Sequence, residues 1–265
     1  MSTLVCFHAH PDDEALSTGG LMAKAAAAGH QVVLVTATRG ELGEPQPGVL
    51  AVGEVLWQRR IEEVAESARI LGAEPPRFLG YEDSGMMGEP TNDNPACFWQ
   101  AEPSEAAERL AAVLTDVSAD ALTVYDDHGL YGHPDHIQVH RVGLAAAELV
   151  GVSNVYEATI NRDRALEAFA EMAAELEAGV EQPSVEELDA FGVAEADLSY
   201  RLDVSGHLDA KRAALAAHRS QIGENSFLLA LPDDRFKVMF AYEWYAVPGR
   251  NGTGGPVEVE LLPGL

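Results

Sequence analysis

Short apolar runs alternate with longer amphipathic stretches over residues 1–160 of the chain. An apolar run at 3–7 precedes a stretch of small and apolar residues at 14–29, and a second apolar run follows at 31–37. This pattern predicts a strand, a helix and a strand, which form a right-handed β-α-β unit. The next predicted elements are a helix over 54–71 ended by Gly72, a strand over 77–80, a helix over 104–117 with Ser104 as its N-cap, a strand over 121–125, a helix over 134–149 and a strand over 155–160. The order predicts an α/β fold with a Rossmann-like, mostly parallel sheet flanked by helices.

The pattern changes after residue 160. Residues 161–197 are rich in Ala and Glu, which predicts two solvated helices inserted after the core. The remainder predicts a strand over 198–204, a helix over 206–222, a strand over 238–247 and a mobile Gly-rich tail over 249–255. We therefore expect one domain over 1–265, made of a catalytic α/β core (1–160), a helical insert (161–197) and a smaller C-terminal strand–helix portion (198–265).

Polar residues gather where two of the predicted strands end. The first strand is followed by His10-Pro11-Asp12-Asp13-Glu14, and Pro11 has no N–H with which to continue a central strand. The strand over 121–125 is followed by a second polar cluster, after which Pro134 is expected at the first position of a helix. Open α/β sheets bind their ligands outside the carboxyl ends of their strands. We expect the two clusters to meet there.

The two clusters contain the residue types of a catalytic metal site. Zinc takes imidazole and carboxylate ligands and keeps one position for water, which predicts His10, Asp13 and His136 as ligands. Asp12 would then be free to act as the general base when the metal-activated water attacks a carbonyl. His133 and Tyr131, in the turn before the second helix, are expected to hydrogen-bond the oxyanion that forms.

The remaining histidines have more ordinary explanations. His8 points to the opposite strand face from His10, which predicts a packed core residue. His140 lies one turn after His136, where helix packing is favoured over a role as a fourth ligand. His30 is expected in a surface turn, whereas His128 and His218 are left open between pocket-lining and structural roles.

The composition of the chain excludes some classes of binding partner. The formal net charge is −26, from 17 basic and 43 acidic residues, so nucleic acids and anionic membrane surfaces would be repelled. The apolar fraction of 47% excludes a disordered chain. The two cysteines, Cys6 and Cys97, are not expected to form a disulfide. No signal peptide or membrane span is visible, so we expect a cytoplasmic protein without a membrane partner, with a homo-oligomer among the open alternatives.

The motif His10-Pro11-Asp12-Asp13-Glu14, together with Tyr131-Gly132-His133-Pro134-Asp135-His136, resembles the LmbE-like (PIG-L) family of zinc-dependent deacetylases. This resemblance implies removal of an N-acetyl group from an N-acetylglucosaminyl conjugate, a small amino-sugar substrate. It also implies Zn²⁺ as cofactor, with Fe²⁺ as the alternative in the cell. By the same resemblance, His133 is the acid or oxyanion stabiliser, and Asp135 orients His133.

Two further matches resemble the mycothiol-pathway branch of this family. They are Arg60-Ile61 and the stretch Asp83-Ser84-Gly85-Met86. The resemblance implies that Arg60 and Asp83 contact a sugar–inositol substrate. The stretch 126–130 departs from that branch, so a different N-acetylglucosaminyl conjugate is kept open as the substrate. A mycothiol S-conjugate-type amidase is a further alternative. Outside the family, the alternatives are a non-haem iron enzyme with two histidines and one carboxylate, and a non-catalytic sugar-binding protein.

Overall fold

The computed structural model describes residues 1–175, 191–224, 226–249 and 254–262. The strands are β1 (Thr3–His8), β2 (Gln31–Thr36), β3 (Arg77–Phe78), β4 (Ala121–Tyr125), β5 (Asn154–Thr159), β6 (Tyr200–Asp203), β7 (Tyr242–Ala246) and β8 (Val257–Glu258). The α-helices are α1 (Asp13–Ser17), α2 (Gly19–Ala27), α3 (Leu56–Ile70), α4 (Pro103–Asp116), α5 (Gly129–Gly132), α6 (Pro134–Val150), α7 (Arg162–Glu175), α9 (Leu208–Ala217), α10 (Phe227–Ala230) and α11 (Asp233–Phe240).

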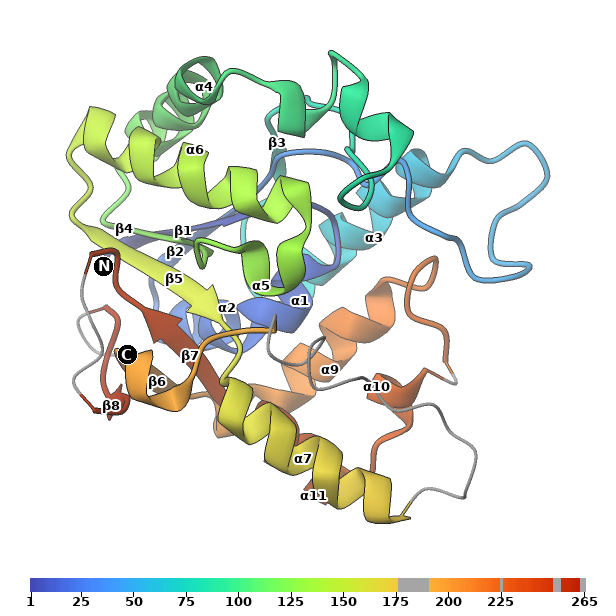
Figure 1. The fold of residues 1–265 in the computed structure, drawn as a ribbon, viewed down its shortest axis with the longest axis vertical. Coiled ribbons are helices and arrows are strands. Elements are labelled where there is room, and N and C mark those ends of the chain that lie inside the picture. The colour runs from blue at the N-terminus through green and yellow to red at the C-terminus, as the bar shows by residue number, and fades with distance from the viewer. Residues whose placement is uncertain (176–190, 225, 250–253, 263–265) are drawn as a thin grey trace.

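All of the strands assigned in these residues belong to one sheet, in the order β3-β2-β1-β4-β5-β7-β6-β8. The neighbouring pairs from β3 to β5 are parallel, whereas β7 runs antiparallel to both β5 and β6. Figure 1 shows helices on both sides of this sheet. The expected Rossmann-like, mostly parallel α/β fold is confirmed, and the C-terminal strands extend the same sheet.

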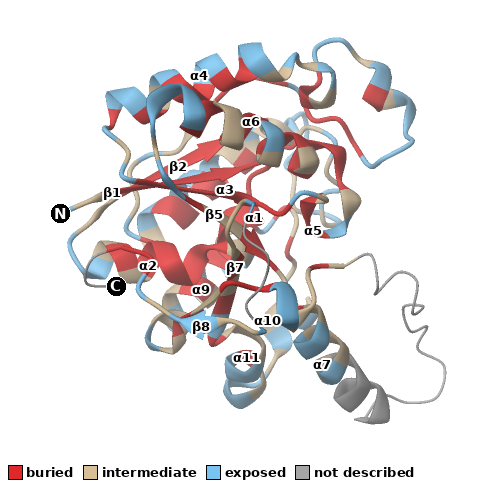
Figure 2. Ribbon diagram, turned by 60° about the vertical axis from the view of Figure 1, so that its left-hand side comes forward, coloured by how far each residue is buried: buried red, intermediate tan, exposed pale blue. Residues whose placement is uncertain are grey.

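The alternating side chains of β1 build two separate cores. Leu4 and Cys6 face the layer that contains α2, α3 and α9, whereas Val5 and Phe7 face α4 and α6. Burial in Figure 2 is accordingly continuous through the central strands and the inner helix faces. Cys6 is a free, buried thiol, and burial raises its pKa to about 12. A strand that is apolar on both faces therefore holds the following loop in a fixed place.

The predicted helix over 14–29 is two helices, and the break has a long-range cause. Thr18, between α1 and α2, has non-helical dihedral angles, and its hydroxyl lies 2.8 Å from His8 Nε2. The carboxylate of Glu243 in β7 accepts the backbone N–H groups of Gly20 at 2.7 Å and Leu21 at 2.9 Å. A carboxylate from the far end of the chain thus caps the new N-terminus of α2.

Two other predicted boundaries are wrong. The N-cap of α4 is Glu102, with Pro103 at the first position, so Ser104 lies inside the helix. The run over 238–247 begins as the end of α11, and only Tyr242–Ala246 is a strand. The rings of Phe236 and Phe240 lie one turn apart with centroids 4.6 Å from each other, which favours the helix.

The insert predicted over 161–197 contains α7, whereas its second predicted helix falls largely on residues 176–190, outside the described residues. Much of the tail predicted to be mobile over 249–255 also falls outside them. After the insert, the predicted strand and helix correspond to β6 and α9. No helix in the described ranges combines the length and apolar character that crossing a membrane requires.

Candidate active site

The two polar clusters meet where the strand order reverses. From β1 the chain moves outward to β2 and β3, and β4, which pairs with β1 on its other side, leads to β5. Such a reversal opens a crevice outside the carboxyl ends of the two central strands. His10 to Asp13 follow β1, and Tyr131 to His136 follow β4. The predicted convergence is therefore confirmed.

The loop after β4 is held in an unusual conformation. Leu130 has φ 67°, a left-handed value that bulky residues rarely adopt. Asp126 Oδ1 accepts the Leu130 N–H at 2.7 Å, and Asp126 Oδ2 accepts the hydroxyl hydrogen of Thr159 at 2.5 Å. His133 then caps α6, which begins at Pro134 as predicted. These contacts fix the backbone that carries Tyr131 and His133.

Asp13 lies between two imidazole rings that come from different strands' loops. Its Oδ2 is 3.4 Å from His10 Nδ1, and its Oδ1 is 3.4 Å from His136 Nε2. His136 is fully buried and stacks on Tyr125 with ring centroids 4.4 Å apart. Neither of its ring nitrogens has a hydrogen-bond partner. Buried polar atoms without partners are rare, and this donor set fits a divalent metal ion.

Other potential ligand atoms surround the same point. Those of His10, His133 and His136 lie within 4.8 Å of one another, as do those of His10, Asp83 and Asp135. Asp13 belongs to neither group, although its carboxylate is 3.4 Å from both His10 and His136. These contacts use both oxygens of Asp13, which favours its carboxylate as a metal ligand. The site thus offers His and Asp groups that could hold one metal ion.

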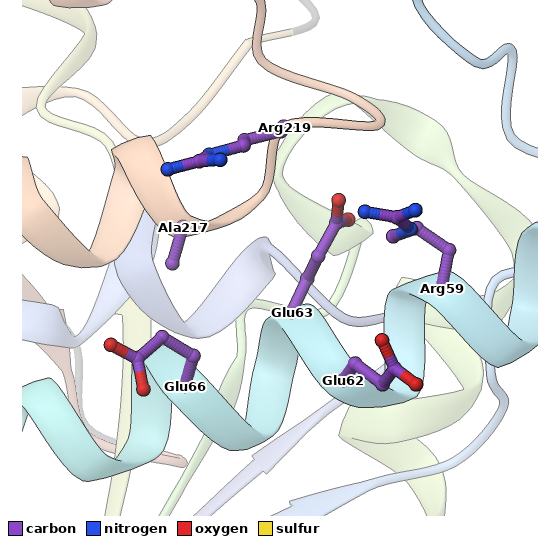
Figure 3. Close-up of a pocket in the computed structure, with 6 residues that line it drawn as sticks. All are labelled: Arg59, Glu62, Glu63, Glu66, Ala217 and Arg219. Atoms are coloured by element: carbon purple, nitrogen blue, oxygen red, sulfur yellow. The ribbon is translucent and has the colours of Figure 1, made fainter. Parts of the chain in front are cut away.

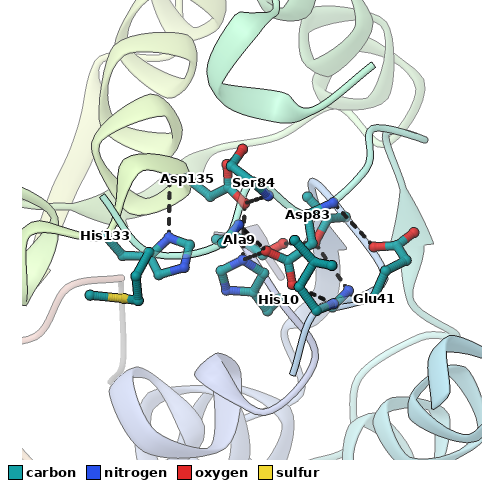
Figure 4. Close-up of polar contacts among 12 residues, drawn as sticks. Ala9, His10, Glu41, Asp83, Ser84, His133 and Asp135 are labelled. Carbon is teal, nitrogen blue, oxygen red and sulfur yellow. Dashed lines mark hydrogen bonds and ion pairs between the residues drawn. The ribbon is translucent and has the colours of Figure 1, made fainter. Parts of the chain in front are cut away.

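The second ring nitrogen of His10, Nε2, lies near two further carboxylates (Figure 4). This nitrogen is 3.1 Å from Asp135 Oδ2 and 3.5 Å from Asp83 Oδ1. Asp135 also accepts hydrogen bonds from the amide and hydroxyl of Ser84. Asp135 contacts His133 through its backbone instead, where its N–H donates to His133 Nδ1 at 3.1 Å. The Asp135 carboxylate therefore faces His10 and not His133, and Ser84 is a participant that the sequence reasoning missed.

Asp12 and Arg60 form a second pair at the site. Arg60 Nη2 is 3.3 Å from Asp12 Oδ1 and donates a hydrogen bond to Pro11 O at 2.5 Å, and Nη1 donates to Gly40 O at 2.8 Å. Burial and the neighbouring Asp13 raise the pKa of Asp12, although the Arg60 guanidinium opposes this. Arg60 is only 3% exposed, and its Nη2 serves the Asp12 loop while Nη1 holds Gly40 in the loop after β2. Its Nε is buried without a hydrogen-bond partner.

The remaining histidines lie outside the metal-binding groups. His8 is a buried core residue, as expected, between Tyr125 Oη at 2.7 Å and Thr18 Oγ1 at 2.8 Å. His140 donates from Nδ1 to Tyr125 O at 3.0 Å, which agrees with the packing role. His128 lies beside Asp126 and Asp127. His30 Nδ1 accepts the Ser2 N–H, and His218 is fully buried beneath the site, away from the rim that the sequence left open.

Tyr131 stands at the opening of the site and is 41% exposed. Its ring stacks against Phe191 with centroids 6.3 Å apart. Phe191 comes from the residues that precede β6, and the neighbouring Gly192 N–H donates to Leu130 O at 2.8 Å. Sequence reasoning missed Phe191 because a single aromatic residue in a Glu-rich segment carries no distinctive signal.

A separate surface pocket of about 180 Å³ lies between α3 and the end of α9 (Figure 3). Three of its charged side chains already have partners, since Glu63 accepts from the amide and hydroxyl of Ser220, Arg59 pairs with Glu54, and Glu66 pairs with Arg69. No residue of the metal-binding groups lines it. The residues that could hold a metal ion lie instead beyond the carboxyl ends of β1 and β4.

Comparison with known proteins agrees with this geometry. The model of the PIG-L family, described as GlcNAc-PI de-N-acetylase, matches residues 5–147, and the chain belongs to this family of deacetylases. A relative from Salinispora arenicola, a 1D-myo-inositol 2-acetamido-2-deoxy-α-D-glucopyranoside deacetylase, is 41% identical over 99% of this chain and 91% of its own. The resemblance to the mycothiol branch is therefore confirmed.

Two solved structures share the fold at lower identity. The N,N'-diacetylchitobiose deacetylase of Pyrococcus horikoshii matches 89% of this chain and 73% of its own, with 23% identity and a TM-score of 0.53. The 4-carboxy-2-hydroxymuconate hydratase of Pseudomonas putida KT2440 matches 97% of this chain and 100% of its own, with 17% identity and a TM-score of 0.56. Since these two proteins differ in reaction, the fold alone does not define the chemistry.

Proposed function

We propose that this chain hydrolyses the acetamide of 1D-myo-inositol 2-acetamido-2-deoxy-α-D-glucopyranoside. This compound is the substrate in the name of the deacetylase that is 41% identical to the chain. Water is consumed, the amide C–N bond breaks, and acetate and the free glucosaminyl amine are released. The observation that carries the proposal is the position of the Asp13 carboxylate between the rings of His10 and His136. His136 is buried, and its ring nitrogens have no hydrogen-bond partner. This arrangement lies beside a second carboxylate, that of Asp12, at the strand-order reversal.

His10, Asp13 and His136 would hold the metal ion, with Zn²⁺ as the proposed ion and Fe²⁺ as the alternative in the cell. These three residues supply two imidazoles and one carboxylate, the ligand types of catalytic zinc sites. When bound, such an ion polarises a carbonyl and makes water a better nucleophile near neutral pH. The protein contributes the fixed positions of the ligands, because each lies in the loop or the first helical turn that follows a buried strand.

Asp12 is proposed as the general base. Its side chain keeps 20% of its surface exposed while its Oδ1 is held by Arg60 at 3.3 Å. A carboxylate in this position can take a proton from attacking water and later return it to the departing nitrogen. Asp13 cannot share this role while both of its oxygens face imidazole nitrogens.

His133 is proposed to donate a hydrogen bond to the carbonyl oxygen as negative charge develops there. Its Nδ1 accepts the backbone N–H of Asp135 at 3.1 Å, so the proton of the neutral ring lies on Nε2. Burial lowers the pKa of His133 to about 4. A neutral ring with a fixed Nε2–H donor suits an oxyanion better than a ring free to change tautomer. Tyr131, with its ring 6.3 Å from that of His133, would assist.

Arg60 and Asp83 are proposed to act on the sugar–inositol substrate, in different ways. Asp83 lies against His10 and also accepts backbone N–H groups from Leu42 and Gly85. Its position beside the ligand residues suits a carboxylate that accepts a substrate hydroxyl. Arg60 acts from behind the Asp12 loop, so its contribution would combine substrate binding with support of the base.

The test is amine release from three substrates by the purified, metal-loaded enzyme. They are the inositol conjugate, free N-acetylglucosamine and a mycothiol S-conjugate amide, with Asp12→Ala as the control variant. The proposal expects the highest kcat/KM for the inositol conjugate and loss of turnover in the control. Preferential cleavage of the S-conjugate would select the amidase instead. Absence of amine release from all three would reject amide hydrolysis of this substrate class.

A further inference from the structure

Asp12 is held in a backbone conformation that aspartate does not adopt freely. Its φ is 105° and its ψ is −30°. Non-glycine residues avoid this region because their Cβ crowds the backbone, and holding one there costs roughly 1–3 kcal/mol. Across the described ranges, the other non-glycine residues with positive φ are Ser118 and Leu130. A strained residue persists only when its surroundings fix it, so the contacts of the Asp12 peptide decide where its carboxylate points.

One of these contacts comes from Glu14, whose role the sequence left unassigned. Glu14 Oε2 accepts the backbone N–H of Asp12 at 3.0 Å. The residue follows two positions later in the first turn of α1, so it holds the N-cap peptide much as the Glu of a capping box does. Arg60 holds the opposite side of the same loop through Pro11 O.

Glu14 is itself fixed by two residues from distant parts of the chain. Its Oε1 accepts hydrogen bonds from His218 Nε2 at 2.6 Å and from the hydroxyl of Ser67 in α3. Glu14, Ser67 and His218 are all fully buried. His218 follows α9 directly, so the C-terminal part of the chain reaches beneath the first active-site loop.

Stability alone does not account for this arrangement. A buried ion pair adds little net stability over apolar side chains of similar size. His218 Nδ1 is buried without a hydrogen-bond partner, which is a further cost. An apolar substitute would fill the same space but could not accept the Asp12 N–H.

Building on the proposed function, we infer that Glu14 and His218 are positioning residues for the proposed base, Asp12. Glu14 holds the Asp12 peptide in its left-handed conformation, and His218 keeps the Glu14 carboxylate turned toward that peptide. Neither residue touches the substrate or exchanges a proton with it. Their effect should therefore appear in kcat and in the geometry of Asp12, not in substrate affinity.

The experiment compares Glu14→Leu, Glu14→Gln, His218→Leu and the double variant Glu14→Leu/His218→Leu, all metal-loaded. The matched control is Glu63→Gln, which alters another buried carboxylate beside the end of α9 that bonds Ser220 and not Asp12. Amine release from the inositol conjugate gives kcat and KM. Bound metal is measured by elemental analysis, and crystal structures give the φ of Asp12.

A misplaced catalytic group typically costs on the order of 10²-fold, so Glu14→Leu should lower kcat roughly 10- to 100-fold with KM and metal content nearly unchanged. His218→Leu should lower kcat less, and the double variant should match Glu14→Leu, because both act through one carboxylate. Glu14→Gln should recover part of the rate, since its carbonyl oxygen can still accept the Asp12 N–H. In crystals of Glu14→Leu, Asp12 should leave the left-handed region.

Full kcat in Glu14→Leu would overturn the inference, as would an equal loss in Glu63→Gln. If Glu14→Leu does not fold, Glu14→Gln and His218→Leu decide by the same criteria. An inactive wild-type enzyme would reject the proposed function. The φ of Asp12 in the variant crystals would then still show whether Glu14 holds Asp12 in its left-handed conformation. If Asp12→Ala retained its turnover, the base assignment and the positioning built on it would both fall.

Discussion

Asp13 Oδ1 lies 3.4 Å from Nε2 of His136, a buried nitrogen that has no hydrogen-bond partner. Asp13 begins the helix after β1, and His136 lies in the first turn of the helix after β4. Because β1 and β4 are parallel neighbours, the loops that follow them meet at the same edge of the sheet. The relationship between these two residues underlies the first two predictions.

The first prediction concerns metal binding by His136. If the wild-type protein binds one divalent ion as proposed, the His136→Ala variant should lose most of it, because His10 and Asp13 alone provide too few ligands. Elemental analysis after desalting measures this directly. His140→Ala is the matched control on the same helix, since His140 bonds Tyr125 O and should not affect the ion. Stoichiometric metal in His136→Ala would remove His136 from the ligand set.

The second prediction separates the two adjacent carboxylates. Asp13→Ala should lose metal affinity, because Asp13 contacts both imidazoles. Asp12→Ala should keep the metal and lose turnover by ~10²–10⁴-fold, the usual loss for a general base. Metal titration and single-turnover kinetics on the same preparations distinguish the two effects. The assignments would have to be exchanged if the variants showed the opposite pattern.

The third prediction concerns Arg60. Its guanidinium bonds Pro11 O and Gly40 O and lies 3.3 Å from Asp12, so it supports the base as well as any substrate group. Arg60→Ala should therefore lower kcat in addition to raising KM for the inositol conjugate. A contact that only binds substrate would raise KM and leave kcat unchanged. Steady-state kinetics at saturating substrate test this, and an unchanged kcat would restrict Arg60 to substrate binding.

Sequence reasoning succeeded where local pattern and strand order decide the structure. The run at 3–7 is apolar on both faces, and the ends of parallel strands must share an edge, so the meeting of His10, Asp13 and His136 follows from connectivity. Pro134 at the start of α6 was also predictable, because its fixed φ and missing N–H suit that position.

The errors arose where distant residues decide the local structure. The break at Thr18 depends on Glu243, which caps α2 from the other end of the chain. His218 was not recognisable as a partner of Glu14, because nothing in the local sequence indicates which residue it would meet across the fold. The backbone N–H of Asp135 bonds His133, but the contacts of its carboxylate with Ser84 and His10 were not visible in the sequence. Side-chain partners of this kind depend on tertiary packing and not on periodicity.

The fourth prediction concerns the buried ion pair of Lys211 and Glu243. Lys211 Nζ lies 2.6 Å from Glu243 Oε1 and also donates to Leu16 O at 2.7 Å. Lys211→Met should lower the free energy of unfolding by about 3–5 kcal/mol, because a buried carboxylate is left without its cation. Urea denaturation measures the loss. The double variant Lys211→Met/Glu243→Gln should recover part of it, since the amide oxygen can still cap α2. A loss of less than about 1 kcal/mol in Lys211→Met is the size expected for an exposed ion pair and would contradict this prediction.

The last prediction uses Glu157 in β5, which lies away from the proposed metal ligands. Burial and the nearby carboxylates of Asp126 and Asp127 raise the pKa of Glu157 from 4.5 to about 7. His140 also faces it, with Nδ1 at 3.4 Å from Glu157 Oε1, but this nitrogen lies closer to Tyr125 O, to which it donates. The folded protein therefore keeps a proton on Glu157 at pH values where the unfolded chain has already released it.

The sign of the resulting pH dependence follows from this difference. The stabilisation from protonated Glu157 is fully present below pH 4.5 and is lost as the pH rises through about 7. Glu157→Gln, which stays neutral, should have nearly wild-type stability at pH 5 and exceed it at pH 8 by on the order of 2 kcal/mol after allowance for solvent screening. Urea denaturation of both proteins across this range measures the difference. A gap in unfolding free energy that does not change with pH would show that folding does not raise the pKa of Glu157.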